Sequence, residues 1–204
     1  GILHLPNGES FVLVFLSKNA PDRSKVQEAA AEIALMFYNF LQEYPDWKIE
    51  LKNSGLVNLK DLDPSIMVQL AYSTVDNILG YDAYGSLEDA YLREEAAVKL
   101  LEAQKMLLAH NPNLRLYIFD AARPRRIQQQ LWDNSDLPVS ERSKYIANPE
   151  RGSIHNFGMA VDLGIYDIDA GLLDMGTKFD DFTEVSHITK EDSLVENGLL
   201  TNNQ

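Results

Sequence analysis

The sequence predicts a globular protein that contains both helices and strands. Hydrophobic residues make up 45% of the 204 residues and charged residues 24%, a balance that allows an apolar core and argues against disorder. Apolar residues recur at helical spacing near 23–43 and 86–110, and they alternate at 114–119 and 159–165. The chain has no internal repeat, and its length fits one or two domains.

Composition excludes several classes of partner and site. The net charge of −13 repels phosphate backbones, so no nucleic-acid partner is expected. The chain has no cysteine, so any metal must be held by histidines and carboxylates. No run of about 18 apolar residues occurs, so no transmembrane helix is expected.

Residues 1–44 are expected to form a β-hairpin followed by a helix. Two β-rich runs flank Pro6-Asn7-Gly8, which is a strong turn signal. Asp22 is typical of a helix cap, and the helical pattern that follows it ends at Pro45. A unit of about 44 residues buries too little surface to be stable alone.

The same segment resembles the C-terminal end of a serine β-lactamase or penicillin-recognising domain. The resemblance rests on Gly-Ile-Leu-His-Leu-Pro-Asn-Gly at the start, then an apolar strand and a long helix. None of that family's catalytic motifs lies in residues 1–44, and any β-hairpin with a helix is the alternative interpretation. Fusion to such a domain would favour an exported, periplasmic protein. Residues 45–55, rich in turn-forming residues, are expected to be a linker.

A second pattern of helices and strands occupies residues 56–204. Ser86, with Asp89 three residues later, forms a capping box, and the helix after it is expected to run to about His110. One face of this helix is expected to be buried: Ala97, Leu100, Leu101, Gln104, Leu107 and Leu108. The alternation at 114–119 predicts a strand, and 125–133 a short helix.

The run 153–162 carries the candidate metal ligands. Alternating apolar residues predict a strand with one face in the core: Met159, Val161, Leu163 and Ile165. On the opposite face, two small residues leave space around the carboxylate of Asp162, and a buried carboxylate beside empty space requires a partner such as a cation. Gly158 allows the backbone to bend so that His155 faces the same point. A neutral imidazole and a carboxylate that converge are good zinc ligands.

The alternative interpretation is a strand with one solvent-facing aspartate and a surface histidine. The whole run, however, fits S-x-H-x-x-G-x-A-x-D, which resembles the zinc motif of the VanX-type D-alanyl-D-alanine dipeptidases and of related D,D-carboxypeptidases. The resemblance implies that His155 and Asp162 bind Zn²⁺ and that Ser153 belongs to the substrate-binding site.

Residues 118–125 resemble the strand of the same family that ends in D-x-x-R-P. The resemblance implies that Arg123 stabilises the oxyanion of the tetrahedral intermediate. A fixed guanidinium suits this role because its charge is permanent and it carries several donors. The alternative is an arginine paired with Asp120 at a strand end.

Two further segments resemble the family and follow its order. Residues 70–80 resemble its Tyr-x-Thr-x-Asp-Asn-Phe-x-Gly run, and residues 174–182 resemble its M-G-x-x-F-D-x-F segment. The second implies that Asp180 meets the substrate ammonium, which restricts the enzyme to dipeptides. The alternative for Asp180 is a solvated acidic loop residue.

The sequence departs from the family at its C-terminal end. The family takes its third zinc ligand and its general base from a later E-x-W-H motif, which does not occur here. Glu184 and His187 have E-x-x-H spacing, but their context matches an upstream family segment, so His187 is expected to be a structural or loop histidine. The chain is therefore expected to be a fragment, truncated at the C-terminus, that alone binds zinc weakly and has negligible peptidase activity.

The resemblance implies an α+β fold over residues 56–204, with helices packed against a central antiparallel sheet, preceded by the N-terminal hairpin and helix. It implies a zinc metallopeptidase whose small peptide substrate is D-alanyl-D-alanine, a peptidoglycan precursor. Removal of that dipeptide serves glycopeptide resistance or D-alanine recycling. The alternatives are a D,D-carboxypeptidase that acts on longer cell-wall peptides and a non-catalytic cell-wall-binding module of the same fold.

Overall fold

The protein falls into two compact units, Gly1–Asp46 and Trp47–Gln204. The computed structural model describes residues 2–4, 10–14, 22–43, 47–135, 137–186 and 188–201. Within these residues, no helix is both long enough and apolar enough to cross a membrane.

The first unit contains a hairpin and a helix. Strand β1 (Ile2–His4) pairs antiparallel with β2 (Ser10–Val12), and helix α1 covers Arg23–Glu43. The carboxylate of Asp22 accepts hydrogen bonds from the backbone N–H groups of Ser24 and Lys25, at 2.9 and 3.5 Å, and so caps α1 as predicted. The expected Pro6-Asn7-Gly8 turn lies outside the described residues.

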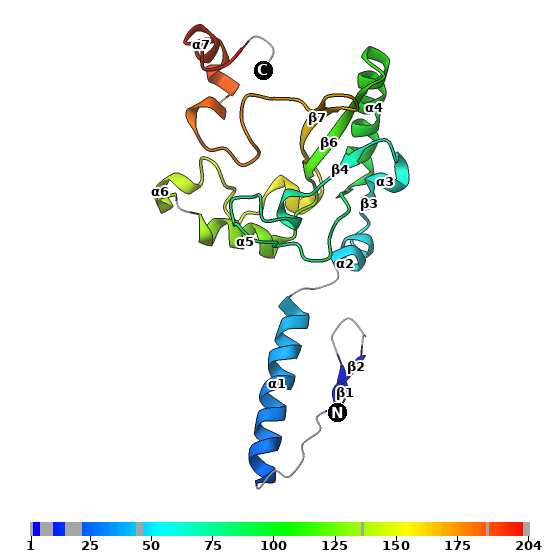
Figure 1. Ribbon diagram of the computed structural model, residues 1–204, viewed down its shortest axis with the longest axis vertical. Coiled ribbons are helices and arrows are strands. Elements are labelled where there is room, and N and C mark those ends of the chain that lie inside the picture. The colour runs from blue at the N-terminus through cyan, green and yellow to red at the C-terminus, as the bar shows by residue number, and fades with distance from the viewer. Residues whose placement is uncertain are drawn as a thin grey trace. The chain divides into compact units, whose positions relative to one another are not determined.

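The second unit has the α+β architecture that the sequence predicts (Figure 1). Its helices are α2 (Trp47–Asn53), α3 (Leu59–Leu62), α4 (Glu94–His110), α5 (Arg125–Asn134), α6 (Val139–Arg142) and α7 (Glu191–Glu196). Its strands are β3 (Val57–Asn58), β4 (Met67–Val68), β5 (Tyr91–Leu92), β6 (Leu114–Asp120), β7 (Asp162–Asp167) and β8 (Gly171–Leu172). Short 3-10 turns cover Ala71–Ser73, Ile154–Phe157, Glu184–Ser186 and Ile188–Lys190.

The central sheet has the strand order β4-β6-β7-β8. The pairs β6/β7 and β7/β8 are antiparallel, and β4 runs parallel to β6. The β6/β7 ladder ends at the pair Asp120 and Asp162, after a register shift between Ile118 and Asp120. Such an irregularity re-aims the side chains beyond it. The end of β6, which leads to Arg123, therefore lies next to the start of β7, which carries Asp162.

Helix α4 packs against β6 and buries the face that its spacing predicts (Figure 1). Ala97, Leu100 and Gln104 are buried, and the Gln104 side chain accepts a hydrogen bond from the N–H of Leu116 at 2.8 Å. This bond satisfies a polar group that would be costly to leave unpaired in the core. The helix thus fixes the strand that leads to Asp120.

Three expectations differ from the structure. The middle of the expected linker is helical, because Trp47 and Leu51 of α2 are buried in the second unit. Helix α4 begins at Glu94, since the residues before it form β5, which pairs with β3. The strand expected from 159 begins at Asp162, and of its expected core face Val161 packs against the core whereas Leu163 is 39% exposed and lines a cavity.

Candidate active site

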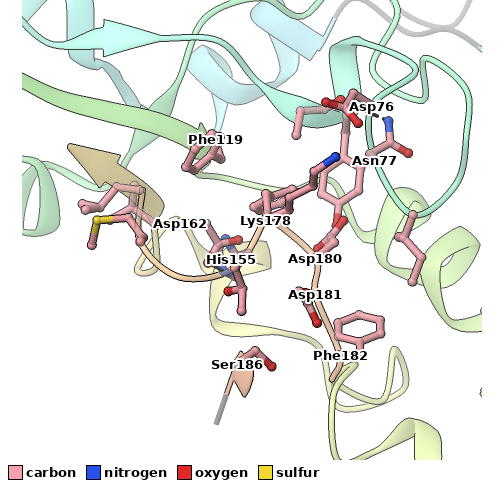
Figure 2. A pocket seen from close by; sticks show the side chains of 18 of the residues that line it. Asp76, Asn77, Phe119, His155, Asp162, Lys178, Asp180, Asp181, Phe182 and Ser186 are labelled. Atoms are coloured by element: carbon pink, nitrogen blue, oxygen red, sulfur yellow. Dashed lines mark hydrogen bonds and ion pairs between the residues drawn. The ribbon is translucent and has the colours of Figure 1, made fainter. Parts of the chain in front are cut away.

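A cavity of about 1360 Å³ opens beside the shared end of β6 and β7 (Figure 2). All five residues that the sequence singles out line it: Arg123, Ser153, His155, Asp162 and Asp180. They come from the end of β6, the turn before β7, β7 itself and the loop after β8. The structure therefore gathers these side chains in one place.

His155 presents one free ring nitrogen to Asp162. Its Nδ1 lies 2.9 Å from the carbonyl oxygen of Ala121, an acceptor, so Nδ1 carries the proton and Nε2 keeps its lone pair. Nε2 lies 3.5 Å from Oδ1 of Asp162. Two ligands at about 2.0–2.2 Å from a tetrahedral metal ion are about 3.3–3.6 Å apart. The pair therefore fits a zinc ion.

The turn that carries His155 is built from its own polar side chains. The Ser153 hydroxyl accepts the N–H of His155 at 3.3 Å, and Oδ1 of Asn156 accepts the N–H of Ser153 at 2.7 Å. The turn ends at Gly158, whose φ of +66° is left-handed. A Cβ there would lie 2.7 Å from a methyl carbon of Leu56. The left-handed conformation thus favours glycine at the bend, as the sequence predicts, and a Cβ would also crowd Leu56 and the backbone of Arg93.

Arg123 is a buried cation held from several sides. Its Nε and Nη2 lie 2.8 and 2.7 Å from Oδ2 of Asp120, and its Nη1 donates to Gln128 at 2.9 Å. Its Nη2 also reaches Oδ2 of Asp162 at 3.5 Å, and the guanidinium lies over the Tyr72 ring. Burial lowers the pKa of Arg123, but the neighbouring Asp120 carboxylate and other groups raise it by more, so the pKa is raised overall and the group stays charged. Arg123 therefore pairs with Asp120, as the alternative interpretation expects, and it also lies beside the candidate metal ligand Asp162.

Asp120 lies in a cluster with His155 and Asp162, and these are the described residues that could together hold a metal ion. Asp120 is fully buried, and both its oxygens are engaged: Oδ1 accepts the Tyr84 hydroxyl at 2.6 Å and Oδ2 accepts Arg123. Its Oδ2 lies 3.6 Å from Nδ1 of His155, which is beyond a hydrogen bond. Both oxygens of Asp120 are therefore already hydrogen-bonded, and its carboxylate positions Arg123.

Asp180 lies in the wall of the same cavity (Figure 2). Its carboxylate accepts the Tyr72 hydroxyl at 2.9 Å and also the backbone N–H of Ile78. Burial raises the pKa of Asp180 to about 6, although Tyr72 and Arg123 oppose the change. Its φ is +60°, the one positive value among the described non-glycine residues. A half-buried carboxylate on a strained backbone is a good site for a substrate cation and differs from the solvated loop residue of the alternative interpretation.

Sequence reasoning missed the partners that hold these groups. Tyr72 lies in the family-like run 70–80, yet its partner Asp180 is 108 residues away, so spacing gives no signal. Gln128 and Tyr84 are likewise visible only in three dimensions. His187 lies outside the described residues, so its expected structural role stays a prediction.

Known proteins resemble this chain over most of its length. The family described as D-ala-D-ala dipeptidase matches residues 52–199. The D-alanyl-D-alanine dipeptidase of Escherichia coli (strain K12) is 34% identical over 132 residues, which are 65% of this chain and 64% of that relative. The chain thus spans just under two thirds of the length of the curated relative that it matches.

Proposed function

The chain belongs to the D-Ala-D-Ala dipeptidase family of peptidases, and on this premise we propose that the protein hydrolyses D-alanyl-D-alanine at a zinc ion held by His155 and Asp162. The observation that carries the proposal is the free Nε2 of His155, 3.5 Å from an oxygen of Asp162 and beside a buried guanidinium. The expected role is in peptidoglycan metabolism, either in recycling or in glycopeptide resistance.

The donor set suits zinc, because imidazole and carboxylate are among its usual ligands. When bound, such an ion supplies an acidified water molecule and a polarised carbonyl group. Catalytic zinc usually has three protein ligands, and the described residues supply two with free donor atoms. The metal-bound state therefore depends on both His155 and Asp162.

Each of the remaining side chains is proposed to contact a different group of the substrate. In this proposal Asp180, which accepts the Tyr72 hydroxyl, binds the ammonium group of the dipeptide. Arg123, beside Asp162, stabilises the oxyanion that forms when the oxygen of water adds to the carbonyl carbon. The Ser153 hydroxyl accepts one N–H and keeps its own proton to donate to the substrate. The amide C–N bond then breaks, and the leaving amine takes up the proton that the attacking water releases.

A D,D-carboxypeptidase that acts on longer cell-wall peptides is the second candidate. The cavity of about 1360 Å³ favours it, because the space exceeds what a dipeptide needs. Asp180 favours the dipeptidase, because an amino terminus blocked by further residues carries no charge there to pair with a carboxylate. Rates on D-Ala-D-Ala, its N-acetyl form and a pentapeptide ending in D-Ala-D-Ala separate the two.

The direct test is release of D-alanine from D-Ala-D-Ala by the purified full-length protein with added zinc. Activity that is lost in both His155→Ala and Asp162→Asn supports the proposal. Zinc binding to the 204-residue chain is measured in parallel, because it does not require turnover. A protein that binds zinc equally well without His155, or that leaves D-Ala-D-Ala intact, contradicts it.

A further inference from the structure

Asn156 connects the turn that carries His155 to the segment that carries Arg123. Its Oδ1 accepts the N–H of Ser153 at 2.7 Å, and its Nδ2 donates to the carbonyl oxygen of Arg123 at 2.7 Å. Both ends of one short amide are therefore used, each at a site residue.

Two other hydrogen bonds join the same two segments. The N–H of Arg123 donates to the carbonyl oxygen of His155 at 3.0 Å, and Nδ1 of His155 donates to the carbonyl oxygen of Ala121 at 2.9 Å. The first involves only backbone atoms, so replacing the Asn156 side chain removes neither its donor nor its acceptor. The second belongs to the candidate metal ligand itself. Asn156 is thus the described side chain that links the segments without being a candidate ligand or substrate contact.

From this geometry we infer that Asn156 is a positioning residue for the proposed reaction, which sets Arg123 at a fixed place relative to His155 and Ser153. The expected effect of Asn156 on the reaction rate rests on the proposed function, whereas its expected effect on the position of Arg123 does not. Side-chain bonds to Asp120 and Gln128 direct the guanidinium. The Asn156 bond fixes the backbone from which that side chain starts.

The chemistry of the position requires an amide. Aspartate at 156 would keep an acceptor for the Ser153 N–H, but it would place a carboxylate oxygen against the carbonyl oxygen of Arg123, 2.7 Å away in the native contact. Alanine would remove both bonds. Asn156→Asp therefore disturbs the Arg123 end selectively, and Asn156→Ala disturbs both ends.

The first measurement follows the Arg123 Nε–H by NMR in the metal-free protein. This proton is buried and bonded to Asp120, so it exchanges slowly with water. In both Asn156 variants we expect its exchange to become at least about tenfold faster, with a changed chemical shift. The matched control is Asn113→Ala, which also loses a 2.7 Å bond from an asparagine Nδ2 but lies away from the cavity. It should leave the Arg123 signal unchanged.

The second measurement separates kcat from KM for D-Ala-D-Ala. A misplacement of about 1 Å costs on the order of 100-fold in rate, so Asn156→Asp should lower kcat by about that factor and change KM less than about threefold. Zinc affinity should stay within about threefold, because Ala121 still orients His155. An unchanged Arg123 signal in both variants overturns the inference. An inactive native protein refutes the proposed function instead, and the NMR result still decides the role of Asn156.

Discussion

Replacement of Asp180 by asparagine should stabilise the metal-free protein at neutral pH while it removes activity. Asp180 holds its proton in the folded protein up to a pKa of about 6, whereas the ordinary value is 3.8. Between these values the folded state binds the proton more tightly than the unfolded chain. The contribution of Asp180 to stability is therefore present at low pH and is lost as the pH rises through this window.

The size of the effect follows from the same two values. Their difference corresponds to about 3 kcal/mol at pH 7, the cost of keeping a charged carboxylate in a partly buried place. Asparagine carries no charge and still offers an oxygen to the Tyr72 hydroxyl, although it loses the stronger bond of a charged acceptor. We therefore expect Asp180→Asn to raise the free energy of unfolding by about 2 kcal/mol at pH 7.

The assay is urea unfolding at pH 7 and at pH 4, with and without the substitution. At pH 4 the native carboxyl group is mostly protonated, so the variant should differ from the native protein by less than about 0.5 kcal/mol. Loss of D-Ala-D-Ala hydrolysis should accompany the gain in stability, because the ammonium partner is gone. An equal change in stability at both pH values would refute the argument from the raised pKa.

Three other substitutions test separate parts of the site. Gly158→Ala should lower the free energy of unfolding by about 1–3 kcal/mol, because φ is +66° and the space is filled. Asp162→Asn should lower the pKa of His155 in the metal-free protein, measured by NMR titration, because a bond to Asp162 helps to raise that pKa against burial. Tyr84→Phe should destabilise by about 1–3 kcal/mol in urea, because it leaves a fully buried oxygen of Asp120 without its donor.

Each of these substitutions has a control and a contradicting result. Gly171→Ala has a positive φ but open space, so a cost equal to that of Gly158→Ala would remove the steric part of the argument. A His155 pKa that rises or stays constant in Asp162→Asn would contradict the pairing. Tyr81→Phe, at an exposed tyrosine, should cost little, and a similar loss at both tyrosines would deny the buried bond.

Local sequence patterns predicted the elements that depend on local physics. The cap at Asp22, the buried face of α4 and the strand β6 follow from hydrogen-bonding chemistry and periodicity within a few residues. The spacing from Ser153 to Gly158 also predicted the turn that aims His155, because the turn is held by its own side chains. These features need no knowledge of distant contacts.

The elements that the sequence did not predict depend on long-range pairing. Strand β5 has two residues and exists only because β3 lies beside it, so it displaces the expected start of α4. The chain from Tyr84 through Asp120 to Arg123 and the contact of Tyr72 with Asp180 join residues that no periodicity relates. The roles of Arg123, Ser153 and Asp180 in the reaction stay predictions, although all three line one cavity.

The pairing of Asp120 with Arg123 also affects the net charge of the side chains around the cavity. That ion pair cancels internally, and the other charged side chains that line the cavity are then mostly acidic, with one lysine, Lys178, against the carboxylates of Asp76, Asp162, Asp174, Asp180 and Asp181. A divalent cation bound by His155 and Asp162 would offset part of this excess of negative charge. Metal uptake should therefore displace protons from the residues around the cavity. Without Asp120, the charge of Arg123 would be unpaired and would repel the metal ion that the carboxylates attract.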